Sequence, residues 1–412
     1  MNVVICSRVV LSRAPEGPLA AHIGTFAKSL VALGYVAKSV HRQVLIASCF
    51  SRWLGHAGVA EQSITADYAV RYLRCRARRL RSCAGDLAAL THFIDFLRRE
   101  GAVPAETIAV RHLTPIDRCA EEYEQYLREA RALARSTIVN YVPFIREFLS
   151  HCFGGGPVVL SRLCAADVVR FVQLQATRLH WKRAKLMTSA LRSFLNYARY
   201  CGEVAADLTG AVPVVPNWSM TSIPRAISPD QVRQLLASID RRTAMGRRDY
   251  AVLLLLARLG LRSGEVASLK LDDIDWNVGQ LTVCGKSGHR SGLPLPPDVG
   301  KAIAAYLQRG RPHCANRYLF LRARAPVRGF RGASGIGSIV RHALHRAGID
   351  APTTGAHQFR HGLATEMLRK GASLGEIGDV LGHRHLQTTK IYAKVDIVAL
   401  RALAMPWPGD AQ

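Results

Sequence analysis

The stretch LGHRHLQTTKIYAKV, residues 381–395, places His383 and Tyr392 nine positions apart near the end of the chain. The pattern Ser373-Leu-Gly-Glu376 just upstream is a capping box, in which a serine and a glutamate satisfy free N–H groups at a helix start. The helix that it predicts ends at the glycine before His383, because glycine readily adopts the left-handed conformation that closes a helix. Tyr392 therefore lies after a helix end. The segments upstream of it contain the residues with which it could act.

The segment GLRSGEVASLKL, residues 260–271, follows an apolar run that predicts a buried helix. Gly260 interrupts that helix and the residues after Arg262 restart one, which places Arg262 at a helix start. Free backbone N–H groups at such a position favour an anion. The alternative is a surface arginine that forms an ion pair with Glu265.

The segment QLTVCGKSGHRSGLPLP, residues 280–296, predicts a β-hairpin with Lys286 near its tip. Leucine and valine alternate with threonine and cysteine over residues 281–284, as in a strand, and GLPL begins a second strand after the turn KSGHRS. The letters GKS also suggest a nucleotide-binding P-loop. That interpretation is disfavoured, because five residues separate Gly279 from Gly285 where the motif needs four, and prolines follow where a helix should begin.

The segment AHQFRHGLATEMLRKGAS, residues 356–373, predicts a helix with an apolar stripe. His357 and Arg360 are three positions apart and share one face of it. His357 and His361, four positions apart, could together hold a metal ion. A metal site is disfavoured, because HQFRH lacks the glutamate of a zinc-protease helix, a third ligand is missing, and the arginine would repel a cation.

These segments together supply two arginines, two histidines, a lysine and a tyrosine to a strongly basic chain. The chain holds 56 Lys and Arg against 30 Asp and Glu, a net charge of +26, which favours a nucleic-acid partner over a membrane surface. Two guanidinium groups can stabilise the negative charge on the non-bridging oxygens of a phosphate. A tyrosine can attack the phosphorus while another group protonates the leaving oxygen. The set suits cleavage of a phosphodiester without a metal.

Residues 225–405 resemble the catalytic domain of the tyrosine recombinases, also called the phage integrase family. The family's signature is an arginine in a G-x-R-x-x-E turn, a lysine on a β-hairpin, an H-x-x-R pair, a histidine after L-G and a tyrosine nine positions further on. This sequence matches the signature in order, at Arg262, Lys286, His357, Arg360, His383 and Tyr392. The resemblance implies a site-specific recombinase or integrase that serves the integration or transposition of a mobile element.

The resemblance also implies roles for these residues. Tyr392 would attack the scissile phosphate, become joined to the 3′ end of the DNA and release a 5′-hydroxyl. Arg262 and Arg360 would hold the non-bridging oxygens, and His383 would hydrogen-bond the phosphate.

Proton transfer falls, by the same resemblance, to Lys286 as the acid for the leaving oxygen and to His357 as proton acceptor or second acid. No cofactor, metal ion or small-molecule substrate is expected, because the covalent intermediate keeps the energy of the phosphodiester bond. Two alternatives remain open. One is DNA relaxation of the type IB topoisomerase kind, and the other is a catalytically idle accessory DNA-binding protein.

The chain upstream of residue 211 is predicted to be helical and to contain a repeat. Three segments of the first copy match, in the same order, three segments of the second. They are FSRWLGHAGV with IREFLSHCFGG, ITADYAVRYL with LCAADVVRFV, and ALTHFIDFLRREGAV with ALRSFLNYARYCGEV. Apolar residues fall at helical spacing in both copies. The second copy resembles the SAM-like core-binding domain of the family. The repeat suggests that the first copy is a second domain of the same kind, and the alternative is a coincidental match between amphipathic helices. Basic clusters such as RYLRCRARRLRS, residues 71–82, suit contacts to DNA phosphates.

The expected fold is mainly α with a small β-sheet: helical DNA-binding bundles followed by a mixed α+β catalytic domain. The expected divisions are a tail (1–20), a first bundle (21–110), a second bundle (115–210), a proline-rich linker (211–226), the catalytic domain (227–405) and a C-terminal tail (406–412). The expected partners are double-stranded DNA and sister recombinases, in a homo- or hetero-tetramer on that DNA.

Composition sets the remaining expectations. Hydrophobic residues make up 49% of the chain, as in a globular protein, and the apolar run at 250–257 is far shorter than the ~20 residues that a membrane span needs. The N-terminus lacks the continuous apolar core of a signal peptide. The ten cysteines include no CxxC pair, which argues against a zinc ribbon or a disulfide scaffold. A cytoplasmic, nucleoid-associated protein is expected.

Overall fold

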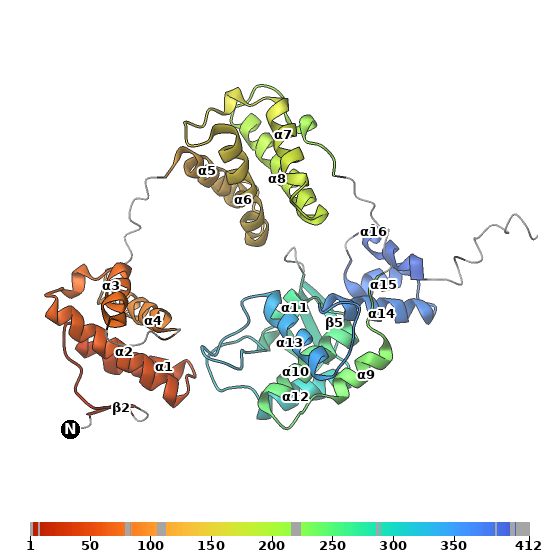
Figure 1. The fold of residues 1–412 in the computed structure, drawn as a ribbon. Helices are drawn as coiled ribbons and strands as arrows, with labels where there is room; N and C mark the ends of the chain where they lie inside the picture. The colour runs from red at the N-terminus through yellow and green to blue at the C-terminus, as the bar shows by residue number, and fades with distance from the viewer. Residues whose placement is uncertain are drawn as a thin grey trace, which may run out of the picture. The chain divides into compact units, whose positions relative to one another are not determined.

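The computed structural model describes residues 3–6, 9–78, 83, 85–104, 113–215, 224–285, 288, 290–383, 385–395 and 400 (Figure 1). Buried hydrophobic side chains form a core within each part of the chain. These parts are the first bundle (core Leu11–Val103), the second bundle (core Cys119–Val212) and the C-terminal part, with a core from Ile227 to Phe359 and a smaller cluster from Ala364 to Tyr392. Helices predominate and the strands are short, so the predicted fold class is confirmed.

The first bundle is a set of helices closed around aromatic residues. Phe26, Phe50 and Phe93 are fully buried in its core. The segment 1–20, expected as a tail, contains two antiparallel strands. The elements are β1 (Val3–Cys6), β2 (Val9–Leu11), η1 (Ala20–His22), α1 (Ile23–Ala32), α2 (Ala37–His56), η2 (Glu61–Ser63), α3 (Ala66–Ala77) and α4 (Asp86–Arg99).

The second bundle repeats the order of elements found in the first. A long helix, a 3₁₀ turn and a helix of 12 residues follow one another in both, as α2, η2 and α3 and as α6, η3 and α7. Phe93 and Phe194, which align in the predicted repeat, are both fully buried. The elements are α5 (Pro115–Glu129), α6 (Arg135–Phe153), η3 (Leu160–Arg162), α7 (Ala165–Ala176), α8 (Trp181–Tyr200) and η4 (Thr209–Ala211).

The C-terminal part is built around α10 (Ala244–Leu259), whose residues 251–256 are each no more than 2% exposed. The helix predicted after Ser228 is present as α9 (Pro229–Ala237), and the Ser228 hydroxyl accepts the N–H of Gln231 at 3.2 Å. The other helices are α11 (Ser263–Ser268), α12 (Pro297–Arg309), α13 (Ala333–Arg346), α14 (His357–Arg369), α15 (Leu374–Leu381) and α16 (Leu386–Thr389), with 3₁₀ segments η5 (Leu271–Asp273) and η6 (Lys390–Val395). The predicted linker 211–226 lies partly outside the described residues.

A three-stranded antiparallel sheet, in the order β3-β4-β5, packs beside these helices. Its strands are β3 (Ile274–Asp275), β4 (Gln280–Cys284) and β5 (Arg290–Pro294). The predicted hairpin is confirmed, but its second strand begins at Arg290, because the register pairs Cys284 with Arg290. The pairing thus runs up to the turn instead of starting at Gly292.

Gly260 joins the central helix to the elements that form the site. It ends α10 in the left-handed region, with φ of 59°, and a Cβ there would lie 2.9 Å from Cδ2 of Leu381. Both features require glycine, since a side chain would strain the backbone and push α15 away. The end of α10 therefore lies directly against α15. No described helix is long and apolar enough to cross a membrane.

Candidate active site

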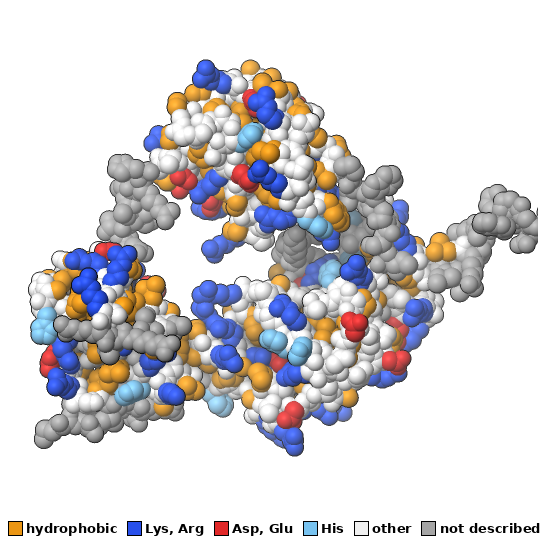
Figure 2. Space-filling view, in the orientation of Figure 1, with side chains coloured by type: hydrophobic (Ala, Val, Ile, Leu, Met, Phe, Trp, Pro, Cys, Tyr) orange, Lys and Arg blue, Asp and Glu red, His pale blue; other side chains and the backbone are white. Residues whose placement is uncertain are grey.

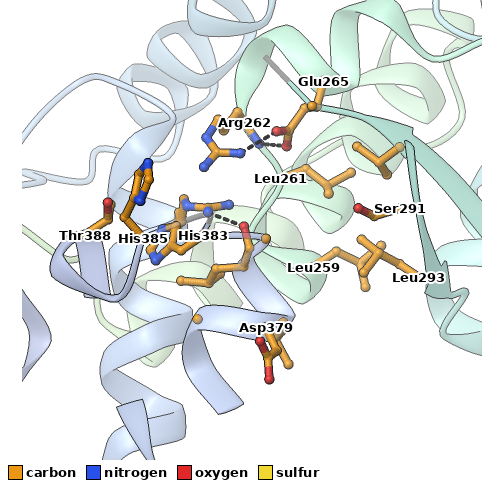
Figure 3. Close-up of a pocket in the computed structure, with 17 residues that line it drawn as sticks. Leu259, Leu261, Arg262, Glu265, Ser291, Leu293, Asp379, His383, His385 and Thr388 are labelled. Atoms are coloured by element: carbon orange, nitrogen blue, oxygen red, sulfur yellow. Dashed lines mark hydrogen bonds and ion pairs between the residues drawn. The ribbon is translucent and has the colours of Figure 1, made fainter. Parts of the chain in front are cut away.

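A cavity of about 550 Å³ opens in the C-terminal part between the end of α10, the sheet and the segment after α15. Figure 3 shows His383, His385 and Thr388 on one side of this cavity and Ser291 and Leu293 on the other. Three of the six residues predicted for the site line it: Arg262, Arg360 and His383.

Arg262 stands at the start of α11, as predicted, and it also forms the ion pair with Glu265 that the alternative interpretation named. Its Nη1 lies 2.6 Å from Oε1 of Glu265, and its backbone N–H donates to Oε2 of the same residue at 2.8 Å (Figure 3). The glutamate side chain is 8% exposed and the arginine side chain 35% exposed. Glu265 therefore fixes the arginine from the protein side, while part of the guanidinium faces the cavity.

Arg360 is a buried cation held by backbone carbonyls. The residue is 3% exposed, its Nη1 donates to the carbonyl of Gly260 at 2.8 Å, and its Nη2 donates to the carbonyl of Leu381. Burial, then the charge of Arg262, lowers the pKa of Arg360 to about 10, so the group stays protonated at neutral pH. A guanidinium has five N–H groups, so N–H groups remain for an anion in the cavity.

His383 follows the left-handed Gly382 that ends α15, as predicted. Its Nδ1 lies 2.8 Å from the hydroxyl of Thr389, which is fully buried. Burial and the charges of Arg360 and Arg262 lower the pKa of His383 to about 4. The imidazole is therefore neutral at pH 7, with Nε2 left to hydrogen-bond an oxygen in the cavity.

His357 does not line the cavity, and Lys286 is not among the described residues. His357 begins α14, and its ring packs edge-on against that of His361 with centroids 5.1 Å apart. Partial burial, then the charges of Arg360 and Arg262, lower the pKa of His357 below its usual value. Lys286 lies outside the described residues, but Gly285 and Ser291 on either side of its turn both line the cavity.

Tyr392 lies behind the cavity wall. The residue is 1% exposed and packs in a cluster with Ala364, Ile377 and Leu381, and Leu381 also lines the cavity. Its hydroxyl lies 3.1 Å from Nδ1 of His361. Burial raises the pKa of Tyr392, while the charges of Arg360 and Arg262 act in the opposite direction. The hydroxyl is therefore protonated at rest and lies within reach of both arginine charges.

His361 is the residue whose place the sequence did not predict. It was considered there only as a metal ligand with His357. The signal that could have found it is its position, directly after Arg360 and four residues after His357, on the helix that carries both.

A basic cavity with two arginines and a neutral histidine suits a phosphate group, and a buried tyrosine lies behind its wall. Helical bundles joined to a mixed α+β domain with such a cavity define a strongly basic protein suited to binding a phosphate group. Residues 225–397 match the phage integrase family, and residues 120–200 match the phage integrase N-terminal SAM-like domain.

Similar proteins agree with these matches. The chain is 57% identical over 413 residues to a putative integrase/recombinase, y4rA, of Sinorhizobium fredii, with each chain covered in full. It is 31% identical over 295 residues to the tyrosine recombinase XerD of Listeria innocua, covering 68% of this chain and 95% of that one. The chain therefore belongs to the phage integrase family, the tyrosine recombinases, and is a site-specific DNA recombinase.

Solved structures share the fold. The XerH site-specific recombinase bound to its palindromic difH substrate, in a post-cleavage complex, matches with a TM-score of 0.54 and 20% identity over 75% of this chain and 93% of that chain. A lambda integrase (75–356) dimer bound to a COC′ core site matches with a TM-score of 0.52 and 15% identity over 67% of this chain and 94% of that chain.

Proposed function

We propose that this recombinase cuts and rejoins DNA through a 3′-phosphotyrosine on Tyr392, in the integration or transposition of a mobile element. The observation that carries the proposal is the convergence of Arg262, Arg360 and His383 on one cavity, with Tyr392 packed against Leu381 in its wall. The similarity to a relative named as a putative integrase/recombinase supports the role in a mobile element.

The chemistry follows from these positions. A phosphodiester in the cavity places its non-bridging oxygens between the two guanidinium groups, and His383 donates from Nε2. The Tyr392 oxygen bonds to phosphorus, the bond from phosphorus to the 5′-oxygen breaks, and Lys286, which the sequence places between β4 and β5, protonates that oxygen. Religation reverses these steps with a 5′-hydroxyl from another strand. The bond energy stays in the phosphotyrosine, so the step needs neither a nucleotide nor a metal.

Ionising Tyr392 is the main cost. An unperturbed tyrosine has a pKa near 10, so ionisation at pH 7 costs about 4 kcal/mol, and the burial of Tyr392 adds to that cost. The charges of Arg360 and Arg262 act on the hydroxyl in the favourable direction. Attack thus depends on the same two arginines that hold the phosphate, which couples binding to activation of the nucleophile.

We also propose that both helical bundles contact double-stranded DNA and that the enzyme acts in a tetramer with copies of itself or with sister recombinases. The net charge of +26 supports the first point, and on the face shown in Figure 2 Lys and Arg side chains predominate over Asp and Glu. The similarity to a lambda integrase tetramer bound to a Holliday junction supports the second.

A covalent-adduct assay tests the proposal. The substrate is a DNA duplex that spans one end of the element carrying the gene, labelled at the 5′ end of the cleaved strand. The expected result is a labelled protein band, because a 3′-phosphotyrosine retains the 5′-labelled fragment. Tyr392→Phe should abolish the band and bind the duplex with nearly unchanged affinity. Tyr318→Phe, at a partly exposed tyrosine of the same part, serves as the matched control.

Two outcomes would count against the proposal. Adducts that persist in Tyr392→Phe would assign the nucleophile to another residue. A wild-type protein that relaxes plasmids lacking the element's ends, without joining two such ends, would favour the topoisomerase alternative.

A further inference from the structure

His361 makes a contact to the nucleophile that none of the roles above uses. Its Nδ1 lies 3.1 Å from the Tyr392 hydroxyl, and the two rings meet edge to face with centroids 5.7 Å apart. Within the described part of the chain, His361 is the hydrogen-bond partner of that hydroxyl. His357, the residue to which the family pattern gives a proton-acceptor role, instead contacts the ring of His361.

The direction of this hydrogen bond depends on which ring nitrogen of His361 carries the proton. Burial and the charges of His357 and Arg360 lower the pKa of His361 to about 4, so at neutral pH its ring carries one N–H. In the tautomer with the ring proton on Nε2, the Tyr392 hydroxyl donates and Nδ1 of His361 accepts. A lone pair is thus aimed at the one proton that must leave when the tyrosine attacks.

The charged and titratable groups around His361 explain why this proton stays on the tyrosine at rest. His357 and Arg360 lie on the same helix, α14, and Tyr392 lies in η6. His383, in the segment after α15, also interacts electrostatically with His361. Their balance is positive, and a positive surrounding opposes a second proton on His361. A phosphodiester bound at Arg262 and Arg360 brings a negative charge to the same place, which favours an imidazolium there.

We propose that His361 is a catalytic residue that accepts the Tyr392 proton during attack, and that the bound phosphate makes this transfer possible. The inference rests on the proposed function. As the bond from the tyrosine oxygen to phosphorus forms, the hydroxyl proton passes to Nδ1 of His361. The bond from phosphorus to the 5′-oxygen breaks, and that oxygen takes its proton from the acid on the leaving side. In religation His361 returns the proton to Tyr392.

The test separates accepting a proton from accepting a hydrogen bond. His361→Asn places an amide oxygen near the position of Nδ1, so it keeps an acceptor that cannot become protonated. We expect single-turnover adduct formation on the 5′-labelled duplex to slow by about 10²–10⁴-fold, as is usual when one acid–base group is lost. DNA affinity and melting temperature should stay close to those of the wild type. His345→Asn, at an exposed histidine on α13, is the matched control and should cleave normally.

Cleavage of a substrate with sulfur in place of the 5′-bridging oxygen provides a second measurement. Thiolate leaves without a proton, so this substrate rescues defects on the leaving side and should not rescue His361→Asn. Free imidazole should speed His361→Ala, in which the ring has been removed. His361→Gln, also neutral, replaces the asparagine variant if that variant does not fold.

Cleavage by His361→Asn within threefold of the wild type would overturn the inference and leave His361 as a hydrogen-bond acceptor alone. Rescue of that variant by the sulfur substrate would overturn it as well, by moving His361 to the leaving side. Failure of the proposed function looks different, because the wild-type protein would then form no adduct on either substrate.

Discussion

Replacing Arg360 by methionine should abolish cleavage while leaving the C-terminal part folded. Methionine fills much of the same volume but donates no hydrogen bond, so the carbonyls of Gly260 and Leu381 lose their partner. Hydrogen bonds from charged donors contribute about 1.5–3 kcal/mol each, a loss of about 3–6 kcal/mol in the free energy of unfolding. Burial and the neighbouring Arg262, however, lower the pKa of Arg360 from its ordinary value to about 10.

The lowered pKa means that the folded protein disfavours the positive charge of Arg360, by about 3 kcal/mol in the free energy of unfolding. The uncharged methionine would avoid this penalty. The net loss is then about 0–3 kcal/mol, which lowers the melting temperature of a domain this size by no more than about 12 °C. In the proposed mechanism the same substitution removes a donor that stabilises the transition state, so cleavage should fall by at least about 10²–10³-fold. Activity should therefore be lost well before the fold is.

Differential scanning calorimetry of the full chain and the adduct assay measure the two effects separately. Arg258→Met is the matched control, because Arg258 forms an exposed ion pair with Asp298 at 2.9 Å, and such pairs contribute little. It should cleave normally and melt within a degree or two of the wild type. An unfolded Arg360→Met protein would show that the carbonyl bonds outweigh the charge penalty, and near-normal cleavage would show that Arg360 does not act on the phosphate.

Three further predictions follow from the site and the repeat. Lys286→Ala should cleave normal DNA about 10²–10⁴-fold more slowly and be largely restored by the 5′-sulfur substrate, whereas Arg262→Ala should stay slow on both. Equal impairment of Lys286→Ala on both substrates would exclude it as the acid. Deleting residues 1–105 should make the dependence of DNA affinity on salt concentration shallower, since fewer phosphates are contacted, and an unchanged slope would remove the first bundle from the DNA. Finally, the melting temperature should fall as the pH drops from about 6.5 towards 4. In the folded protein the pKa values of His361 and His383 are lowered to about 4, so both histidines stay neutral over this range, whereas in the unfolded chain they bind protons. Proton binding by the unfolded chain therefore destabilises the folded state. Replacement of both histidines by asparagine should flatten this fall, and an unaltered pH profile would contradict the assignment.

Local signals explain what the sequence predicted well. The sequence predicted Arg262 at a helix start, Arg360 on a helix face and His383 at a helix end. Each of these local features depends on residues within one or two helical turns. The capping box at Ser373, with Oγ accepting the N–H of Glu376 at 3.2 Å, is present as predicted. Such features can be predicted without the tertiary structure, because neighbours in the sequence determine them.

The pairing of His361 with Tyr392 could not be predicted in this way. The two residues are 31 positions apart, and the packing of α14, α15 and η6 around Ile377 and Leu381 sets the distance between them. Sequence spacing suggested for His361 only a metal site shared with His357, which the sequence itself disfavoured. The structure instead packs those rings edge to face and directs Nδ1 of His361 at the tyrosine.

The repeated bundle has a consequence for how long the enzyme stays on DNA. If both bundles contact the duplex, each holds the other near its site after a local release, and the effective concentration for rebinding is set by the short chain between them. A weak match under one bundle then shortens the residence time far less than it would for a protein with a single bundle. In the proposed role, integration or transposition of a mobile element, such an enzyme can sample divergent insertion sites without dissociating from the DNA.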